Sequence, residues 1–462
     1  MSGELKANSL SFFESLVMGV AGSAPGYTIA VTTAVLIATV GHLAPGALLI
    51  FSVPMLGIAV AYKALSKHDV NAGAAYRWTT AVCGRFMGFF SGWALLIASM
   101  VFMITGSIPI ATATLDFINP SLAGNVVVTA AVASGWFIAV AAVLIAGIEI
   151  TSRVQVVMTT IELVILLAVL VAAFVHVSHT GAINSFSWAW FELDYTPGNF
   201  AASALVVVFF YWGWDVTSNL GEETAGGGDS AGNGGFSSVF VTILFYIGFT
   251  VAALFLFSTK DAKNLTDNIV YNMAIVSGLG HTGALLASLA VILSSIATLE
   301  TTMLQFSRTL FAMGRDAALP RVFGEVGAKT QTPVRAMYVL MVVGLALIWA
   351  SGLMPSVSVI ISSSVSAVGI QVAYYYGLAG LVAAWVFRAS YRESFGRWLM
   401  VCLYPGLSGL SLIGLGIYAV TTFSLVTTIV GLGGFALGIL FFRSRPYGAP
   451  QEPLSAAASG RA

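Results

Sequence analysis

Long apolar stretches recur along the whole chain, and short polar segments separate them. Twelve of these stretches are long enough to cross a hydrocarbon layer of about 30 Å. They lie near residues 11–39, 45–66, 85–115, 124–147, 152–178, 199–224, 236–258, 283–312, 334–353, 357–387, 397–418 and 421–442. The pattern predicts an all-α integral membrane protein with twelve transmembrane helices, and the even number places both termini on one side.

Composition and charge sharpen this picture. The chain is 58% hydrophobic and only 8% charged, whereas about a quarter of the residues in a soluble domain carry charge. With the N-terminus inside, all 19 Lys and Arg residues except Lys260 and Lys263 lie in inner loops, helix ends or tails. Because cytoplasmic loops are enriched in cations, we expect a multi-pass protein of the plasma (inner) membrane with both termini cytoplasmic.

The first apolar stretch is interrupted near its centre. Residues 22–26 read Gly-Ser-Ala-Pro-Gly, and Pro25 removes one backbone donor while the glycines permit an unwound path. Unpaired backbone groups are costly in lipid, so such a break faces other helices or a cavity. The motif alone fits either a simple proline kink or half of a substrate site.

The sixth stretch is interrupted in the same way. Gly213 lies about 21 Å into it at 1.5 Å per residue, and Asp215 follows two residues later. An ionisable group at that depth is expensive unless it faces a cavity. Two interrupted segments at corresponding positions of two halves are typical of an inverted-repeat transporter with its site at the midplane.

A further motif runs from the eighth stretch into the following inner loop. Residues 307–320 read Ser-Arg-Thr-Leu-Phe-Ala-Met-Gly-Arg-Asp-Ala-Ala-Leu-Pro, and Gln331-Thr-Pro-Val follows. Together with Gly213-Trp-Asp, Glu222-Glu223 and residues 72–76 (Ala-Gly-Ala-Ala-Tyr), this pattern resembles the amino acid–polyamine–organocation superfamily of secondary transporters over nearly the whole chain. The sequence departs from that family at Ser-Ala-Pro-Gly, where many members have Gly-x-Gly, and in the glycine-rich run after Glu223.

The resemblance implies a LeuT-like fold. Residues 1–10 would form a cytoplasmic N-terminus, and residues 11–178 and 199–387 would form two inverted repeats of five helices each. Helices 1 and 6 of this 5+5 arrangement would be broken. Residues 397–442 would supply helices 11 and 12, and residues 443–462 a cytoplasmic tail.

The resemblance also implies a substrate site between the two breaks. Ser23, Ala24, Pro25 and Gly26 would bind a substrate carboxylate, which agrees with the positive partial charge of helix N-terminal amides. Carbonyls near Phe210, Tyr211 and Gly213 would receive a substrate ammonium group. The aromatic side chains of Phe209 and Trp214 would gate the pocket or stack on the substrate, unless they only pack in the core.

Two acidic residues are candidates for proton coupling. Glu162 lies about 15 Å into the fifth stretch, near the bilayer centre, where several proton-coupled members of the family carry a lysine beside the unwound first helix. A carboxyl there could take up and release a proton during the conformational change. Asp215 competes for the same role, and the alternative for Glu162 is a neutral acid hydrogen-bonded to the broken backbone.

Sodium coupling is the alternative energy source. Ser294, Ser295 and Thr298 lie near the middle of the eighth stretch, at positions that bind sodium in sodium-coupled relatives of the fold. Their hydroxyls could equally bond back to their own helix. Glu300 lies nearer the cytoplasm and is assigned to an inner gate, and Glu149 and Arg153 form an i,i+4 pair at an inner helix end.

Other functional classes fit less well. We find no clustered histidines or acids for a metal site and no nucleophile with its base, so we expect neither a metal, a cofactor nor an enzyme. The intramembrane acids are too isolated for the pore of a channel. Residues 226–235 are expected to be a glycine-rich inner linker. The prediction is a secondary transporter of an amino acid or related small amine, proton-coupled, with sodium symport or ion-independent exchange as alternatives and no nucleic-acid partner.

Overall fold

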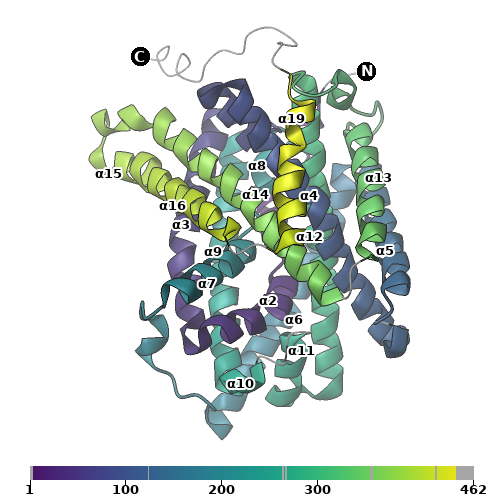
Figure 1. Ribbon diagram of the computed structural model, residues 1–462, viewed down its shortest axis with the longest axis vertical. Coiled ribbons are helices and arrows are strands. Elements are labelled where there is room, and N and C mark those ends of the chain that lie inside the picture. Colours follow the sequence, from purple (N-terminus) through teal and green to yellow (C-terminus); the bar gives the residue numbers. More distant parts are fainter. Residues whose placement is uncertain are drawn as a thin grey trace.

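The computed structural model describes residues 4–122, 124–262, 265, 268–353, 357–421 and 424–443. These residues form helices and loops without a strand, and one isolated parallel bridge joins Leu10 to Thr224. Most of the long helices run roughly along the long axis of the molecule (Figure 1). Of the expected cytoplasmic segments, residues 1–3 and 444–462 lie outside the described residues.

The helices follow one another with short connections. Up to the second break they are α1 (Phe12–Ser23), α2 (Pro25–Val40), η1 (Gly41–Leu43), α3 (Ala44–His68), α4 (Ala75–Ile118), η2 (Pro120–Leu122), α5 (Val126–Ala146), α6 (Ile148–Thr180), η3 (Trp188–Phe191) and α7 (Pro197–Phe210). After it come α8 (Val216–Asn219), η4 (Gly221–Glu223), α9 (Gly227–Leu256), α10 (Thr259–Ala262), α11 (Ile269–Ala274), η5 (Ile275–Leu279), α12 (Gly280–Arg315), η6 (Arg321–Gly324) and α13 (Val334–Ser351). The last group is α14 (Val357–Val386), η7 (Arg388–Arg392), α15 (Phe395–Trp398), η8 (Leu399–Leu403), α16 (Tyr404–Val420), α17 (Leu425–Thr428), η9 (Ile429–Gly433), α18 (Gly434–Ala436) and α19 (Gly438–Phe441).

Nine helical segments within the described residues are long and apolar enough to cross a membrane. The number is lower than the twelve predicted stretches for three structural reasons. The elements α1, α2, η1 and α3 follow one another over residues 12–68 without a longer loop and count once. The stretch at 199–224 is divided into α7, α8 and η4, and the last apolar helix, Ile429–Phe441, is short. The all-helical, multi-pass character of the chain is confirmed.

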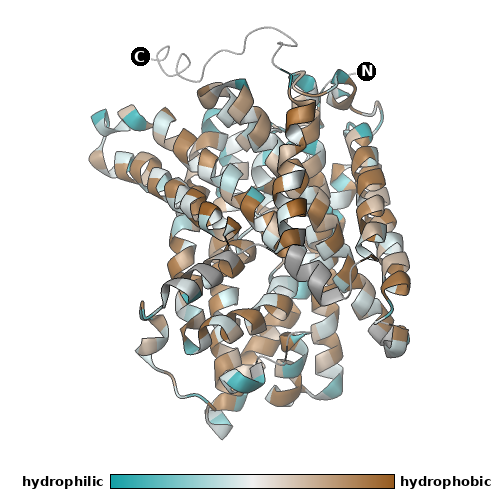
Figure 2. Ribbon diagram, in the orientation of Figure 1, coloured by the Kyte–Doolittle hydropathy of each residue, from teal (hydrophilic) through white to brown (hydrophobic). Residues whose placement is uncertain are grey.

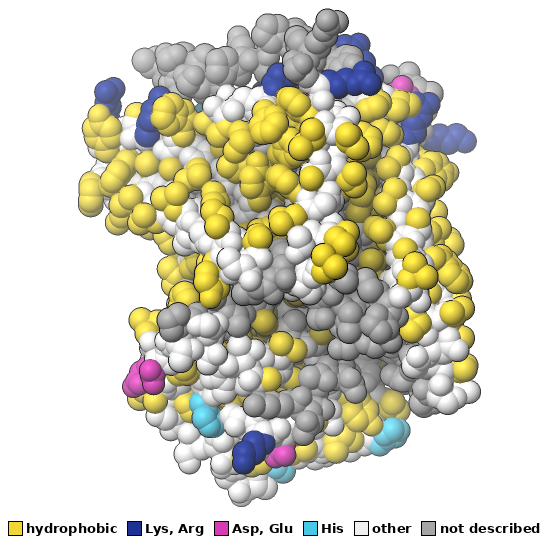
Figure 3. Space-filling model, viewed as in Figure 1, with side chains coloured by type: hydrophobic (Ala, Val, Ile, Leu, Met, Phe, Trp, Pro, Cys, Tyr) yellow, Lys and Arg dark blue, Asp and Glu magenta, His cyan; other side chains and the backbone are white. Residues whose placement is uncertain are grey.

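The sides of the molecule are apolar and its cations are unevenly placed. Leu244, Val342 and Leu440 each expose at least 70% of their surface, and apolar residues colour much of the helix surface in Figure 2. Lys and Arg side chains gather at the end that is uppermost in Figure 3, where α19 lies in Figure 1. An apolar belt of this kind is the surface that a membrane protein presents to lipid.

The first break is a left-handed residue followed by a new helix. Ser11 caps α1 in a capping box with Glu14, and α1 ends where Ala24 takes φ 48°. Pro25 then begins α2, a position where its missing N–H and fixed φ are favourable. The proline therefore opens a second half-helix and is not a kink inside one continuous helix.

The two breaks meet backbone to backbone. Gly213 takes φ +101°, and a Cβ added to it would lie 2.2 Å from the carbonyl oxygen of Gly22. A Cβ added to Gly22 would lie 2.2 Å from the carbonyl oxygen of Gly213. Only glycine allows this approach, so the sequence at each break is fitted to the other.

Gly22→Ala is therefore expected to destabilise the protein by about 1–3 kcal/mol, the usual cost of overpacking, because the clashing atom belongs to the backbone. The measurement is thermal unfolding of the detergent-purified protein. Gly135→Ala is the control, since Gly135 lies inside α5 with nothing within 4 Å of an added Cβ. It should be neutral or slightly stabilising. Equal stability of Gly22→Ala and the unmodified chain would contradict the backbone contact.

The glycine-rich run after the second break is helical, so the prediction of a linker at residues 226–235 is wrong. α9 begins at Gly227 and passes through the run. A Cβ on Gly228 would lie 1.8 Å from the carbonyl oxygen of Ser66, and one on Gly234 would lie 2.6 Å from the hydroxyl of Ser15. The glycines let α9 pack closely against α3 and α1.

Candidate functional site

A buried carboxyl group lies against the first break. Gly26 donates its backbone N–H to Oε1 of Glu162 at 2.9 Å, and Glu162 is fully buried in α6. A Cβ added to Gly26 would lie 3.2 Å from the same oxygen and 3.1 Å from Cβ of Ser294. The start of α2, the middle of α6 and the middle of α12 therefore meet at Gly26.

The carbonyl groups freed at the first break accept hydrogen bonds from the protein itself. Thr298 donates its hydroxyl to the Gly22 carbonyl at 3.0 Å, and Tyr246 donates to the Ser23 carbonyl at 2.7 Å. The Thr28 N–H reaches the Ala24 carbonyl at 2.8 Å. Three neighbouring elements thus hold the unwound backbone in place.

The three hydroxyl residues of the expected sodium site do not act together. Thr298 contacts the break, and Ser294 lies beside Gly26. Ser295 instead donates to the carbonyl of Val291 within its own helix, at 2.8 Å. The helix-internal alternative therefore describes Ser295, whereas Thr298 contacts backbone that a cation could share.

The second break holds its own carboxyl group. Asp215, fully buried, accepts from Tyr376 at 2.7 Å on Oδ1 and from Gln305 at 2.6 Å and Tyr375 at 3.2 Å on Oδ2. Trp212 donates its indole N–H to the Tyr375 hydroxyl at 2.6 Å. Asp215 thus ties the second break to α14 and α12, and shares none of these partners with Glu162.

The aromatic residues around the two breaks divide into two groups. Trp214 packs against Tyr62 and Tyr376, with ring centres 5.2 and 5.6 Å apart. Phe210 and Tyr211 pack against Tyr246 on α9 at 5.0 and 5.5 Å. Tyr211 donates to the carbonyl of Leu48 at 3.2 Å, and Phe209 is 5% exposed. All of them are buried, and the first group adjoins Asp215 through Tyr376.

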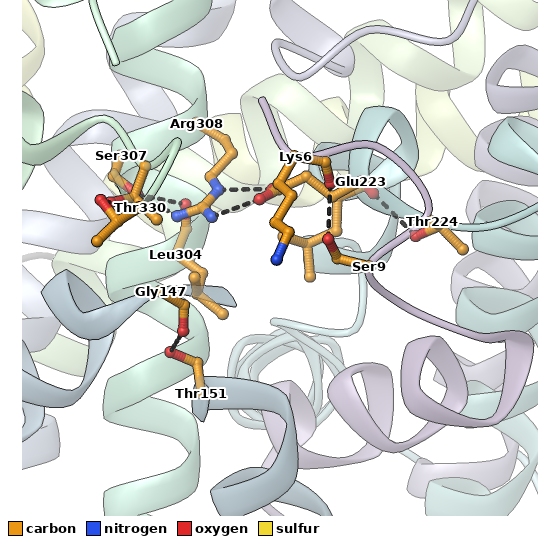
Figure 4. Close-up of polar contacts among 12 residues, drawn as sticks. Lys6, Ser9, Gly147, Thr151, Glu223, Thr224, Leu304, Ser307, Arg308 and Thr330 are labelled. Atoms are coloured by element: carbon orange, nitrogen blue, oxygen red, sulfur yellow. Dashed lines mark hydrogen bonds and ion pairs between the residues drawn. The ribbon is translucent and has the colours of Figure 1, made fainter. Parts of the chain in front are cut away.

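A buried ion pair joins α12 to η4 (Figure 4). Arg308 of α12 donates from Nε and Nη2 to both carboxylate oxygens of Glu223, at 2.9 and 2.8 Å, and both side chains are fully buried. The neighbouring Glu222 pairs with Arg315 at 2.7 Å. These two pairs hold the C-terminal end of α12 against the segment that follows the second break.

The start of the chain covers this ion pair. Ser9 and Leu10 donate their N–H groups to the carbonyl of Glu223 at 2.8 and 3.1 Å, and Ala225 donates to the carbonyl of Leu10 at 2.7 Å. Lys6 forms an exposed ion pair with Glu149 at 2.7 Å. The direct partner of Glu149 is thus Lys6, and the nearby charge of Arg153 also acts on Glu149.

One buried acid has no partner. Glu300 in α12 is 1% exposed, and neither carboxyl oxygen has a hydrogen-bond partner among the described residues. We expect Glu300→Met to raise the free energy of unfolding by about 1–3 kcal/mol, because the substitution removes an unsatisfied buried polar group. Thermal unfolding tests this. Glu223→Met is the comparison and should destabilise the protein, because it leaves the buried Arg308 without its ion-pair partner. A lower midpoint for Glu300→Met would mean that the carboxyl supports the fold.

The sequence patterns did not indicate several residues of this region. Tyr62, Tyr246, Tyr375 and Tyr376 lie in apolar helices, where tyrosine also occurs in ordinary packing. Gln305 was the more detectable of the group, because an amide inside a membrane helix needs a partner. Two hydroxyls of the Tyr374-Tyr-Tyr run on α14 bond to Asp215, and the run itself was a signal that could have been used.

Apolar helices that enclose two broken segments with buried carboxyl groups define a membrane transport protein. The sequence matches the amino acid permease family over residues 10–441. The chain therefore belongs to that family, whose members are transporters and not enzymes.

Individual relatives are distant. The vacuolar cationic amino acid transporter 4 of Arabidopsis thaliana is 25% identical over 366 residues, which cover 74% of this chain and 58% of the relative. A methylthioribose transporter and a branched-chain amino acid permease, both of Bacillus subtilis, are 24% and 25% identical. Each match covers 71% of this chain and 72% of the relative. The substrates for which these relatives are named differ widely in chemistry.

Proposed function

We propose that the protein is a secondary active transporter that moves an amino acid or related small amine across the plasma membrane by alternating access. The observation that carries the proposal is the close contact of the two breaks at Gly22 and Gly213. The carboxyl of Glu162 contacts the first break, and Asp215 lies in the second. A midplane site between two broken helices is the usual design of such transporters. The cationic end of the molecule supports an orientation with both termini cytoplasmic.

The helix contacts support the proposed 5+5 arrangement. α6 packs on α12, and the corresponding fifth helix of the second half, α14, packs on α4. α4 packs on α5 as α12 packs on α13. These two pairs of contacts correspond between the halves, as an inverted repeat predicts. The segment from α15 to α19 then lies outside the repeat.

Proton coupling is the energy source we propose. Glu162 and Asp215 are both buried. Glu162 lies in α6 and accepts from Gly26 at the first break, and Asp215 lies in the second break itself, so each contacts a segment that would move during the transport cycle. A carboxyl that is buried in one state and exposed in another can release a proton between the two. Sodium is the second candidate, because Thr298 and Ser294 lie beside the backbone of the first break.

The test is uptake of radiolabelled amino acids and amines into proteoliposomes that contain the full chain. Proton symport predicts saturable accumulation that follows an imposed pH gradient and collapses with a protonophore. Accumulation that follows a sodium gradient instead would select the second candidate, and ion-independent counterflow would make the protein an exchanger. Currents without saturation would contradict all three.

A further inference from the structure

The start of α2 is where a substrate carboxylate would be expected to bind, and its donors are not free. Pro25, the first residue, has no N–H, and the N–H of Gly26 is taken by Glu162 at 2.9 Å. Helix N-terminal amides bind anions because their N–H groups and partial positive charge converge there. In this chain the anion position is occupied by the protein's own carboxyl group.

A second carboxylate brought to this position would face the charge of Glu162. The nearby carbonyls of Gly22, Ser23 and Ala24 already accept from Thr298, Tyr246 and Thr28. Oε2 of Glu162 has no hydrogen-bond partner among the described residues, although the side chain is fully buried. The hydroxyl of Ser294, beside Gly26, is also buried without a partner among the described residues. A hydroxyl donates one hydrogen bond whereas a carboxylate accepts several, so the break keeps acceptor capacity for a donor such as an ammonium group.

Acids outnumber cations among the ionisable groups buried in the described part of the chain. Glu162, Asp215, Glu223 and Glu300 are buried acids, and Arg308 is the only buried Lys or Arg. Arg308 is used by Glu223, so the other three acids have no buried cation to match them. A permeant that brings positive charge would compensate them, whereas one that brings a carboxylate would add to the imbalance.

From these observations we infer that the substrate is an organic amine without a carboxylate, whose ammonium group binds Oε2 of Glu162. This inference rests on the proposed transport function and narrows its substrate class. The aromatic cluster of Tyr62, Trp214 and Tyr376 beside Asp215 adds ring faces of the kind that attract organic cations, and Tyr62 and Trp214 each have an unpartnered polar atom.

The test compares amino acids with their decarboxylated amines, which differ only in the carboxylate. The pairs are tyrosine with tyramine, lysine with cadaverine, and leucine with 3-methylbutylamine. For the full chain in proteoliposomes, we expect saturable uptake of at least one amine, with its amino acid partner at least ten-fold weaker as a competitor. Amino acid uptake that equals or exceeds amine uptake would overturn the inference and leave the transport function intact. If no compound is taken up or shifts the thermal midpoint, the proposed function itself fails.

Two substitutions at Glu162 separate charge from the occupied amide. Glu162→Gln keeps an oxygen that can accept from Gly26 but removes the charge, so amine affinity should fall at least ten-fold without a gain for amino acids. Glu162→Ala also frees the amide, so amino acid affinity should rise. The exposed variant Glu149→Gln should leave the preference unchanged. The inference is overturned if amine affinity is the same in the unmodified chain and in folded Glu162→Gln.

Discussion

Arg308→Met is expected to lower the free energy of unfolding by about 3–5 kcal/mol, the usual cost of leaving one member of a buried ion pair uncompensated. Both side chains of the pair are fully buried and joined by two hydrogen bonds, so no water would replace the lost guanidinium. The expected signs are a low yield of folded protein and an early thermal transition in detergent.

The double variant Arg308→Met/Glu223→Met separates the stranded charge from the loss of the pair itself. Replacing both partners with apolar residues is often neutral, so the double variant should recover most of the stability. Arg335→Met is the control, because its pair with Glu325 is exposed and such pairs contribute at most about 1 kcal/mol. A double variant as unstable as Arg308→Met alone would mean that Arg308 acts through other contacts.

Glu162→Gln is expected to abolish accumulation of substrate against a gradient while counterflow exchange at saturating substrate continues. The amide can still accept from Gly26, so the break keeps its geometry, but it cannot carry a proton. Accumulation and counterflow in the same proteoliposomes measure the two activities, and the exposed variant Glu325→Gln should retain both. If accumulation survives in Glu162→Gln with unchanged pH dependence, Asp215 becomes the candidate for proton coupling.

Much of the fold could be predicted because a membrane helix is recognisable from the residues of its own segment. The length of each apolar stretch predicted the helices. Pro25 and Gly213 indicated the two breaks, because proline lacks a backbone N–H and glycine can adopt a positive φ. The same local reading failed at residues 226–235. A glycine-rich run indicates a loop when no other element packs on it. Here the glycines allow α9 to approach α3 and α1, and both of these helices are remote in sequence.

The site was harder to predict because it depends on how the helices are rotated about their axes. The depth of Glu162 followed from the rise per residue, but its bond to Gly26 required knowing which face of α6 meets the start of α2. The same holds for Asp215, whose partners come from α12 and α14. The direct partner of Glu149 is Lys6, 143 positions away, and no pattern along the sequence could indicate a partner so remote.

The link between the start of the chain and the segment after the second break has an evolutionary consequence. Ser9 and Leu10 are joined to Glu223, and Leu10 to Ala225, through backbone hydrogen bonds. Every amino acid except proline supplies the N–H donor of such a bond equally. Selection can therefore preserve this link while the residue at the partly exposed position 9 changes. Apart from the bond of the Ser9 hydroxyl to the carbonyl of Lys6 at 2.9 Å, the link does not depend on the side chain at position 9. A mutational scan should therefore find that position tolerant of most residues but not of proline, and a family alignment would underrate its importance.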